Sequence, residues 1–163
     1  MLKVRNGVRE DLERIMEIYR YAQDFMIAAG NPTQWAHTYP TQELIESDME
    51  KGVCKVIYDE DGIHGVFALF AGADPTYAHI EGRGWLNDEP YVTIHRLAGD
   101  GVTHGMFATA LEYSKGECDN VRVDTHADNA PMQKLADKAG FTRCGTIYVA
   151  DGSPRVAFHW SAK

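Results

Sequence analysis

Residues 91–116 read YVTIHRLAGDGVTHGMFATALEYSKG and combine three patterns. Residues 91–98 have the β-branched and apolar composition of a strand, which the Gly-Asp-Gly sequence at residues 99–101 ends. Gly116 is a typical helix end, and it follows a helical face made by Phe107, Ala110 and Leu111. This segment predicts a strand, a glycine-rich loop and a helix in direct succession.

The chain after residue 116 predicts a second strand and helix and then a final pair of strands. Residues 121–125 have a strand pattern. The helix that follows stops at Gly140 and has one apolar face, made by Met132, Leu135, Ala136 and Ala139. Residues 142–149 and 155–160 are predicted as strands joined through Asp151-Gly152.

The chain before residue 91 starts with two predicted helices. The first has apolar residues every three to four positions, begins after the acidic Glu10-Asp11 and ends near Gly30. Thr41 is positioned to cap a shorter helix that ends at Gly52. Two strands at residues 53–58 and 63–71 then form a predicted hairpin, because the Asp-Gly pair between them favours a tight turn.

This order of elements predicts an α/β fold, a mixed sheet with helices on its faces. The 163 residues contain no internal repeat and no Gly/Ser/Pro linker, so residues 1–163 are predicted to form a single domain. A domain of this length buries about 70% of the surface that its unfolded chain exposes, so its stability requires no metal or disulfide.

The composition disfavours several classes of function. Sixteen Lys and Arg against 24 Asp and Glu give a formal net charge of −8, which argues against nucleic acid as a partner. The longest apolar run, residues 66–71, is far shorter than a membrane span. Three cysteines without a C-x-x-C pair, and an N-terminus without the apolar core of a signal peptide, favour a cytoplasmic protein.

Three motifs together resemble the GNAT superfamily of N-acetyltransferases. They are Ile94-His95-Arg96-Leu97-Ala98 followed by Gly105, then Asp124-Thr125-His126-Ala127-Asp128-Asn129-Ala130-Pro131-Met132, and finally Lys138-Ala139-Gly140-Phe141. The order of elements agrees with that family along nearly the whole chain. The resemblance implies a mostly antiparallel sheet of six to seven strands, with acetyl-coenzyme A (acetyl-CoA) in a gap where two central strands splay apart.

The resemblance also implies which residues hold acetyl-CoA. Backbone amides around Gly105, at a helix start, would bind the diphosphate. The family loop reads Arg or Gln, two residues, Gly, one residue, then Gly or Ala, so Val102 and Phe107 depart from it, while His104 is an additional donor. Asn129 is expected to bond the pantetheine arm, to cap the following helix, or both. The predicted cofactor-binding residues are Leu97, Ala98, Val102, Thr103, His104, Gly105, Met106, Phe107 and Asn129.

Acetyl transfer to an amine requires a base, a donor to the oxyanion and an acid for the leaving thiolate. The family often has a Tyr acid where this chain has Ala136, which leaves Tyr148 as the replacement candidate. Thr93 aligns best with the family's carboxylate base, and His95 lies two residues further on the same strand face. His95 and His126 are the candidate bases, because an imidazole titrates near neutrality. A structural role is the alternative for all three candidates.

The resemblance implies that the acceptor enters beside the first two helices and their connection. Trp35 and Tyr39 lie in that connection, and their rings either wall a pocket around a cation or cover the edge of the core. The resemblance implies a small-molecule amine or a peptide N-terminus as acceptor, and the acidic net charge would attract such a cation. A homodimer is compatible with the family.

The sequence therefore predicts an N-acetyltransferase that uses acetyl-CoA as co-substrate, without a metal, by direct attack in a ternary complex. The main alternative is a non-catalytic module that binds or senses acyl-CoA, because Ala136 and the degenerate loop depart from the family pattern. A metal-dependent enzyme built on Asp124 and His126 is a third reading. A thiol enzyme using Cys144 and His126 is a fourth.

Overall fold

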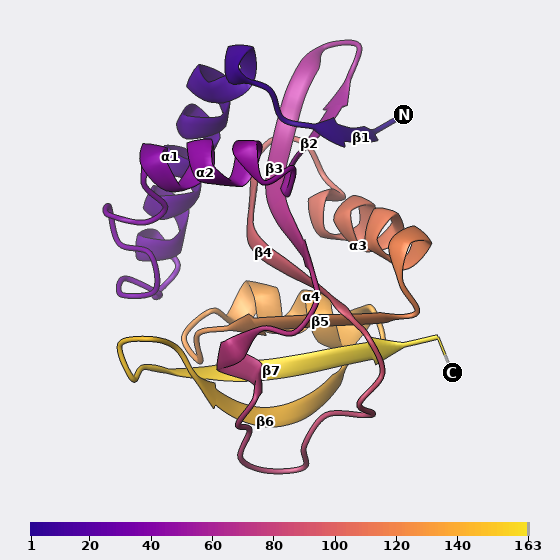
Figure 1. The fold of residues 1–163 in the computed structure, drawn as a ribbon. Helices are drawn as coiled ribbons and strands as arrows, with labels where there is room; N and C mark the ends of the chain where they lie inside the picture. The colour runs from indigo at the N-terminus through magenta and orange to yellow at the C-terminus, as the bar shows by residue number, and fades with distance from the viewer. Residues whose placement is uncertain (163) are drawn as a thin grey trace.

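The computed structural model describes residues 1–162, which form a seven-stranded sheet with helices on both faces (Figure 1). The strands, in the order in which they neighbour one another, are β1 (Lys3–Asn6), β2 (Cys54–Asp59), β3 (Gly62–Ala71), β4 (Val92–Gly99), β5 (Asn120–Thr125), β7 (Pro154–Ser161) and β6 (Thr142–Tyr148). The helices are α1 (Leu12–Ala28), α2 (Gln42–Glu50), α3 (Met106–Glu117) and α4 (Ala130–Lys138). Two 3-10 turns, η1 (Arg9–Asp11) and η2 (Pro75–Tyr77), complete the elements. The predicted mixed sheet is confirmed.

The sheet opens between β4 and β5. All other neighbouring strands are antiparallel, whereas β4 and β5 are parallel and pair only at Val92 with Val121 and at Thr93 with Arg122. Beyond Thr93 the two strands diverge, as Figure 1 shows. The predicted splay of two central strands is therefore confirmed, and it lies towards the carboxyl ends of both strands.

Helices cover the two faces of the sheet and create separate cores. Val56 of β2 packs with Ile15 and Tyr19 of α1, whereas its neighbour Ile57 packs on the opposite face in the cluster that includes Phe107 of α3. Successive residues of a strand point to opposite faces, so β2 serves both cores. In Figure 1, α1 and α2 lie on one side of the N-terminal strands and α3 lies on the other.

The first strand was not predicted. Residues 3–6 form β1, which pairs antiparallel with β2 at the edge of the sheet, whereas the sequence indicated that the chain starts with two helices. Only Val4 of these four residues is apolar, so the segment has no strand pattern of its own. Its position depends on backbone hydrogen bonds to β2. The predicted helices and other strands end within two residues of the observed bounds.

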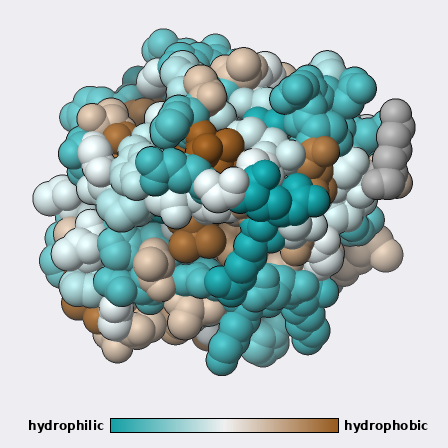
Figure 2. Space-filling model, turned by 90° about the horizontal axis from the view of Figure 1, so that it is seen from below, coloured by the Kyte–Doolittle hydropathy of each residue, from teal (hydrophilic) through white to brown (hydrophobic). Residues whose placement is uncertain are grey.

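The outer surface is largely hydrophilic on the face shown in Figure 2, where hydrophobic residues form small separate patches. No helix within residues 1–162 combines the length and the apolar character that crossing a membrane requires.

Candidate active site

Two cavities lie along the diverging ends of β4 and β5. The central cavity, of about 630 Å³, is lined by the α1–α2 connection, η2, β4, β5 and the turn between β6 and β7. The loop groove, of about 450 Å³, is lined by α1, the end of β4, residues 101 and 103–107 and the start of α4. The cavities meet, because they share the lining residues Met26, Leu97, Asn129 and Met132.

A β-bulge shapes β4 at the junction of the two cavities. Ala68 pairs with His95 and Val66 with Ala98, so that Arg96 and Leu97 together oppose a single residue of β3. Arg96 has a φ of +54°, a left-handed conformation that is uncommon for a residue other than glycine. A bulge leaves one residue out of the ladder and re-aims the strand. Backbone groups at Arg96–Leu97 are therefore released from the sheet beside the cavities.

Contacts from two helices hold this bulge in place. The Tyr19 hydroxyl of α1 donates to the Arg96 carbonyl oxygen at 2.7 Å. The guanidinium of Arg96 makes an ion pair with Asp48 of α2 at 2.8 Å and donates to the Tyr39 hydroxyl at 3.0 Å. The strained conformation of Arg96 is thus fixed by partners that are distant in the sequence, of which Tyr19 and Asp48 are buried.

His95 lines the central cavity and is oriented by a carboxylate. Its Nε2 lies 3.0 Å from Asp74 Oδ2, and Asp74 also accepts hydrogen bonds from the backbone N–H and the hydroxyl of Thr76. The hydrogen bond with His95, together with those from Thr76, lowers the pKa of Asp74 to about 2. Because Asp74 is ionised, Nε2 of His95 is the nitrogen that donates to it, so Nδ1 is the acceptor whenever the imidazole is neutral.

Carboxylates outnumber cations in the central cavity. Asp74, Asp124 and Asp151 line it, against Arg96 and Arg155. The Tyr77 hydroxyl donates to Asp124 Oδ2 at 2.6 Å. Burial, reinforced by the neighbouring Asp124 charge, raises the pKa of Tyr77 well above its ordinary value. Tyr77 therefore stays a hydrogen-bond donor to Asp124.

The other two candidate catalytic residues lie outside the lining of both cavities. His126 Nδ1 accepts from the Asp128 backbone N–H at 3.0 Å, and its Nε2 lies 3.4 Å from the Thr33 hydroxyl. Tyr148 is exposed and donates its hydroxyl to Glu81 at 2.8 Å, which raises its pKa. His126 fixes a turn, and Tyr148 ties β6 to the segment before β4.

Trp35 and Tyr39, the two candidate acceptor-binding residues, both line the central cavity. Trp35 is buried and packs edge-on against Tyr19, with ring centroids 5.8 Å apart. Tyr39 lies 6.1 Å from Trp35, and its hydroxyl accepts from Arg96. The two rings therefore cover part of the core and form a cavity wall at the same time.

Eight of the nine predicted cofactor-binding residues line the loop groove, and Val102, whose side chain is exposed, does not. Gly105 has a φ of +90° at the start of α3, a conformation that favours glycine. The backbone N–H groups of Val102 and Thr103 donate to Asp100 Oδ1 at 3.0 and 2.8 Å. Those two amides are occupied, so residues 104–107 have the remaining amides at this helix start.

Asn129 caps α4, and it also lies where the resemblance implies that a bound pantetheine arm would pass. Its side-chain oxygen accepts from the Met132 backbone N–H at 3.2 Å, which caps α4, and it lines both cavities. Ala136 is fully buried in the core beside α3. An alanine has no hydroxyl, so this position cannot supply the acid that the resemblance implied for a Tyr there.

Residues 1–162 contain no group of three or more His, Cys, Asp and Glu side chains arranged to hold a metal ion. Asp124 and His126 have separate partners, Tyr77 for the first and the Asp128 backbone for the second. Cys144 is buried, and burial raises the pKa of its thiol.

The sequence did not predict three residues that hold the site together: Asp74, Asp48 and Tyr77. Each lies at least 21 residues from its partner in the site, and none belongs to a local motif. An isolated Asp before a Pro, as at Asp74-Pro75, is an ordinary turn signal, so nothing in its neighbourhood distinguishes it.

No family model and no curated protein matches the chain. A GNAT-family acetyltransferase from Streptococcus agalactiae has a similar structure, with a TM-score of 0.89 and 25% identity over 99% of this chain and 96% of its own. A putative acetyltransferase from Staphylococcus aureus gives a TM-score of 0.70 and 25% identity over 98% and 99%. A phosphinothricin acetyltransferase from Sinorhizobium meliloti, crystallised with acetyl-CoA, is 15% identical and shares the fold, with a TM-score of 0.65 over 98% and 88%. The chain thus has the fold of the GNAT-family acetyltransferases, as its motifs implied.

Proposed function

We propose that this protein transfers the acetyl group of acetyl-CoA to a primary amine of a small molecule or a peptide N-terminus. One observation carries the proposal: the loop groove and the central cavity meet at the β4 bulge and share Leu97 and Asn129. A thioester lying in the groove would reach this junction, and an amine in the central cavity would approach it from the other side. Holding both reactants there would supply much of the rate by proximity.

The side chains suggest how protons move in this reaction. The amine first loses a proton to Nδ1 of His95, whose Nε2–H is bonded to the ionised Asp74. The amine nitrogen then attacks the thioester carbon. A backbone N–H at the Arg96–Leu97 bulge donates a hydrogen bond to the oxyanion that forms and stabilises it. The intermediate then collapses: the carbon–sulfur bond breaks, and the CoA thiolate takes up the proton that the attacking nitrogen loses. His95 releases its own proton to solvent and is neutral again. The net products are the acetylated amine, CoA thiol and one proton released from the ammonium substrate.

The chemistry of the central cavity supports a cationic acceptor. Asp74, Asp124 and Asp151 line the cavity, and the net charge of the whole chain is −8. Carboxylates in a concave site attract and orient an ammonium group. A cytoplasmic location and a homodimer remain predictions.

The decisive experiment is a thiol-release assay with acetyl-CoA and a panel of amines. We expect an amine-dependent release of CoA thiol, matched by an equal amount of acetylated amine in mass spectrometry. Calorimetry with CoA is run in parallel. CoA binding without amine-dependent thiol release would instead support the alternative of a sensing module, which Ala136 favours because no family-type acid stands there. Absence of both binding and thiol release would overturn the proposal.

A further inference from the structure

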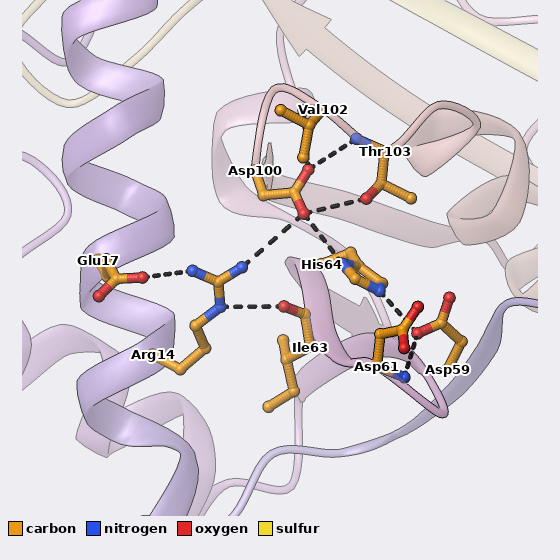
Figure 3. Close-up of polar contacts among 9 residues, drawn as sticks. All are labelled: Arg14, Glu17, Asp59, Asp61, Ile63, His64, Asp100, Val102 and Thr103. Carbon is orange, nitrogen blue, oxygen red and sulfur yellow. Dashed lines mark hydrogen bonds and ion pairs between the residues drawn. The ribbon is translucent and has the colours of Figure 1, made fainter.

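His64 of β3 lies between the carboxylates of Asp59 and Asp100, beside the glycine-rich loop (Figure 3). Its Nε2 is 2.7 Å from Asp59 Oδ1, and its Nδ1 is 2.9 Å from Asp100 Oδ2. Asp59 ends β2, and Asp100 follows β4. The imidazole therefore bridges the hairpin of β2 and β3 to the segment that leads into α3.

This geometry fits a protonated imidazole. A neutral imidazole carries one N–H, so it can donate to only one of two ionised carboxylates, whereas the imidazolium donates to both. The opposing view, that one carboxylate is protonated, conflicts with the other contacts of Asp100. Hydrogen bonds from Thr103, Val102 and His64 outweigh burial and lower the pKa of Asp100 to about 2.

Asp100 organises the loop that lines the groove. Its Oδ1 accepts from the backbone N–H groups of Val102 and Thr103, and its Oδ2 accepts from the Thr103 hydroxyl at 3.0 Å. Arg14 of α1 lies 3.8 Å from Oδ2 and donates through Nε to the Ile63 carbonyl. The position of Thr103 to Gly105 in the groove wall therefore depends on how this single carboxylate is held and neutralised.

We propose that His64 is a positioning residue for cofactor binding: its imidazolium clamps Asp100, sets the loop in the shape that receives the CoA diphosphate, and offsets a carboxylate charge that would repel it. This inference rests on the proposed function. His64 touches no ligand in this scheme, because it acts through Asp100 from the opposite side of the loop.

The proposal makes CoA affinity depend on the charge of His64. The hydrogen bond with Asp59, and that with Asp100, raise the pKa of His64 above its ordinary value. The clamp is therefore fully present below the ordinary imidazole pKa and is lost as pH rises through this raised pKa. Three other sets of charged groups face the cluster: Asp61 in the turn, Arg14 with its partner Glu17 on α1, and the amino terminus. The hydrogen bond with His64 is the main reason that the pKa of Asp59 is lowered, and the amino terminus adds a smaller contribution.

The test measures CoA binding by calorimetry between pH 6 and 9 for the unaltered protein and for His64→Gln. Glutamine can donate to one carboxylate but carries no charge. We expect His64→Gln to bind CoA about tenfold more weakly at pH 6.5, which corresponds to one hydrogen bond to a charged group. The difference between the two proteins should shrink as the imidazole of the unaltered protein deprotonates. Comparing the two proteins cancels the pH dependence that CoA itself and the groups common to both proteins contribute.

The matched control is His79→Gln, which removes an exposed histidine placed 3.7 Å from Glu81 and absent from both cavity linings. It should leave CoA affinity and its pH profile unchanged. His64→Arg keeps a permanent charge and should restore part of the affinity with a flatter profile. In addition, ¹⁵N NMR of the unaltered protein reports both ring nitrogens of His64, and it is independent of whether any variant folds.

The outcomes separate this inference from the proposed function. CoA binding with the same pH dependence in the unaltered protein and in folded His64→Gln would overturn the clamp and leave the transferase proposal standing. A neutral His64 ring at pH 6.5 in NMR would also overturn it. A His64 pKa that rises further when CoA is added would support it, because binding and protonation are reciprocally linked. If the unaltered protein binds no CoA, the proposed function fails and this inference fails with it.

Discussion

Arg96 and Asp48 form a buried ion pair that joins the bulge of β4 to α2. Two hydrogen bonds of 2.8 Å reach the two Asp48 oxygens from Nη2, and Nε adds a third at 3.1 Å. The side chains are only 9% and 2% exposed. The pair therefore fixes the one non-glycine residue of the sheet with a positive φ, at the junction of the two cavities.

Removing one partner of this pair should be costly. We expect Asp48→Asn to lower the free energy of unfolding by about 3 kcal/mol, because it leaves the Arg96 charge buried without its counter-ion. Urea unfolding provides the measurement. Asp137→Asn is the control, since the Arg143–Asp137 pair has similar geometry but is about half exposed, and it should change stability little. Equal effects of the two substitutions would contradict the structural role given to the Arg96 pair.

His95→Ala should lower kcat by about 100-fold, the usual contribution of a general base. Asp74→Asn should lower kcat less, because an amide oxygen can still accept from Nε2–H but no longer stabilises the imidazolium. His126→Ala is the comparison, since it removes the other candidate base. Steady-state thiol release measures all three variants. A large loss in His126→Ala with an unaffected His95→Ala would reverse the assignment of the base.

The two roles of Asn129 can be separated by substitution. Asn129→Ala should cost about 1 kcal/mol of stability, because the cap on the Met132 N–H is lost. Asn129→Ser keeps an oxygen acceptor for the cap and should retain most of the stability. If the Asn129 amide also donates to pantetheine, both variants should bind CoA more weakly. Normal CoA affinity in folded Asn129→Ser would leave Asn129 with the capping role alone.

Acid should destabilise the protein through His159 of β7. This fully buried imidazole accepts from the Leu86 N–H at 3.2 Å and donates to Asn120 at 2.9 Å. Burial lowers its pKa to about 4, with smaller contributions from Arg122 and Arg83. In the unfolded chain the imidazole takes up its proton near pH 6.5, so the unfolded state binds more protons between pH 6.5 and 4.

Stability is therefore fully present above pH 6.5 and decreases by about 3 kcal/mol as pH falls to 4, since each pKa unit corresponds to about 1.4 kcal/mol. Urea unfolding at a series of pH values measures this slope. His159→Gln should be less stable at pH 7 and have a shallower slope. A slope identical to that of the unaltered protein would show that other groups cause the acid destabilisation.

The sequence could predict the elements whose signals are local. The helical face at Phe107, Ala110 and Leu111, the Asp-Gly turn before Ile63 and the glycine stop at Gly140 each depend on neighbouring residues, and all three elements are present. The edge strand β1 could not be predicted, because it forms by pairing with residues 55–58. The four residues of β1 have almost no intrinsic preference for a strand.

The candidate site was predictable in outline only. Most of the proposed cofactor-binding residues belong to one continuous segment, so a motif could locate them on the groove. The orientation of His95 depends on Asp74, and the bulge depends on Asp48 and Tyr19, which approach from other elements. The sequence also gave no indication that Asp100 occupies the amides of Val102 and Thr103, since that requires the loop conformation itself.

The short pairing of β4 with β5 has a mechanical consequence. The N-terminal and C-terminal parts of the sheet share two residue pairs, so the backbone ladder is shortest at this seam, and the side chains of one core cluster hold the two parts together across it. A cofactor seated along the seam would bridge both parts and resist their separation. Occupancy would then stiffen the sheet where its own strand pairing is shortest.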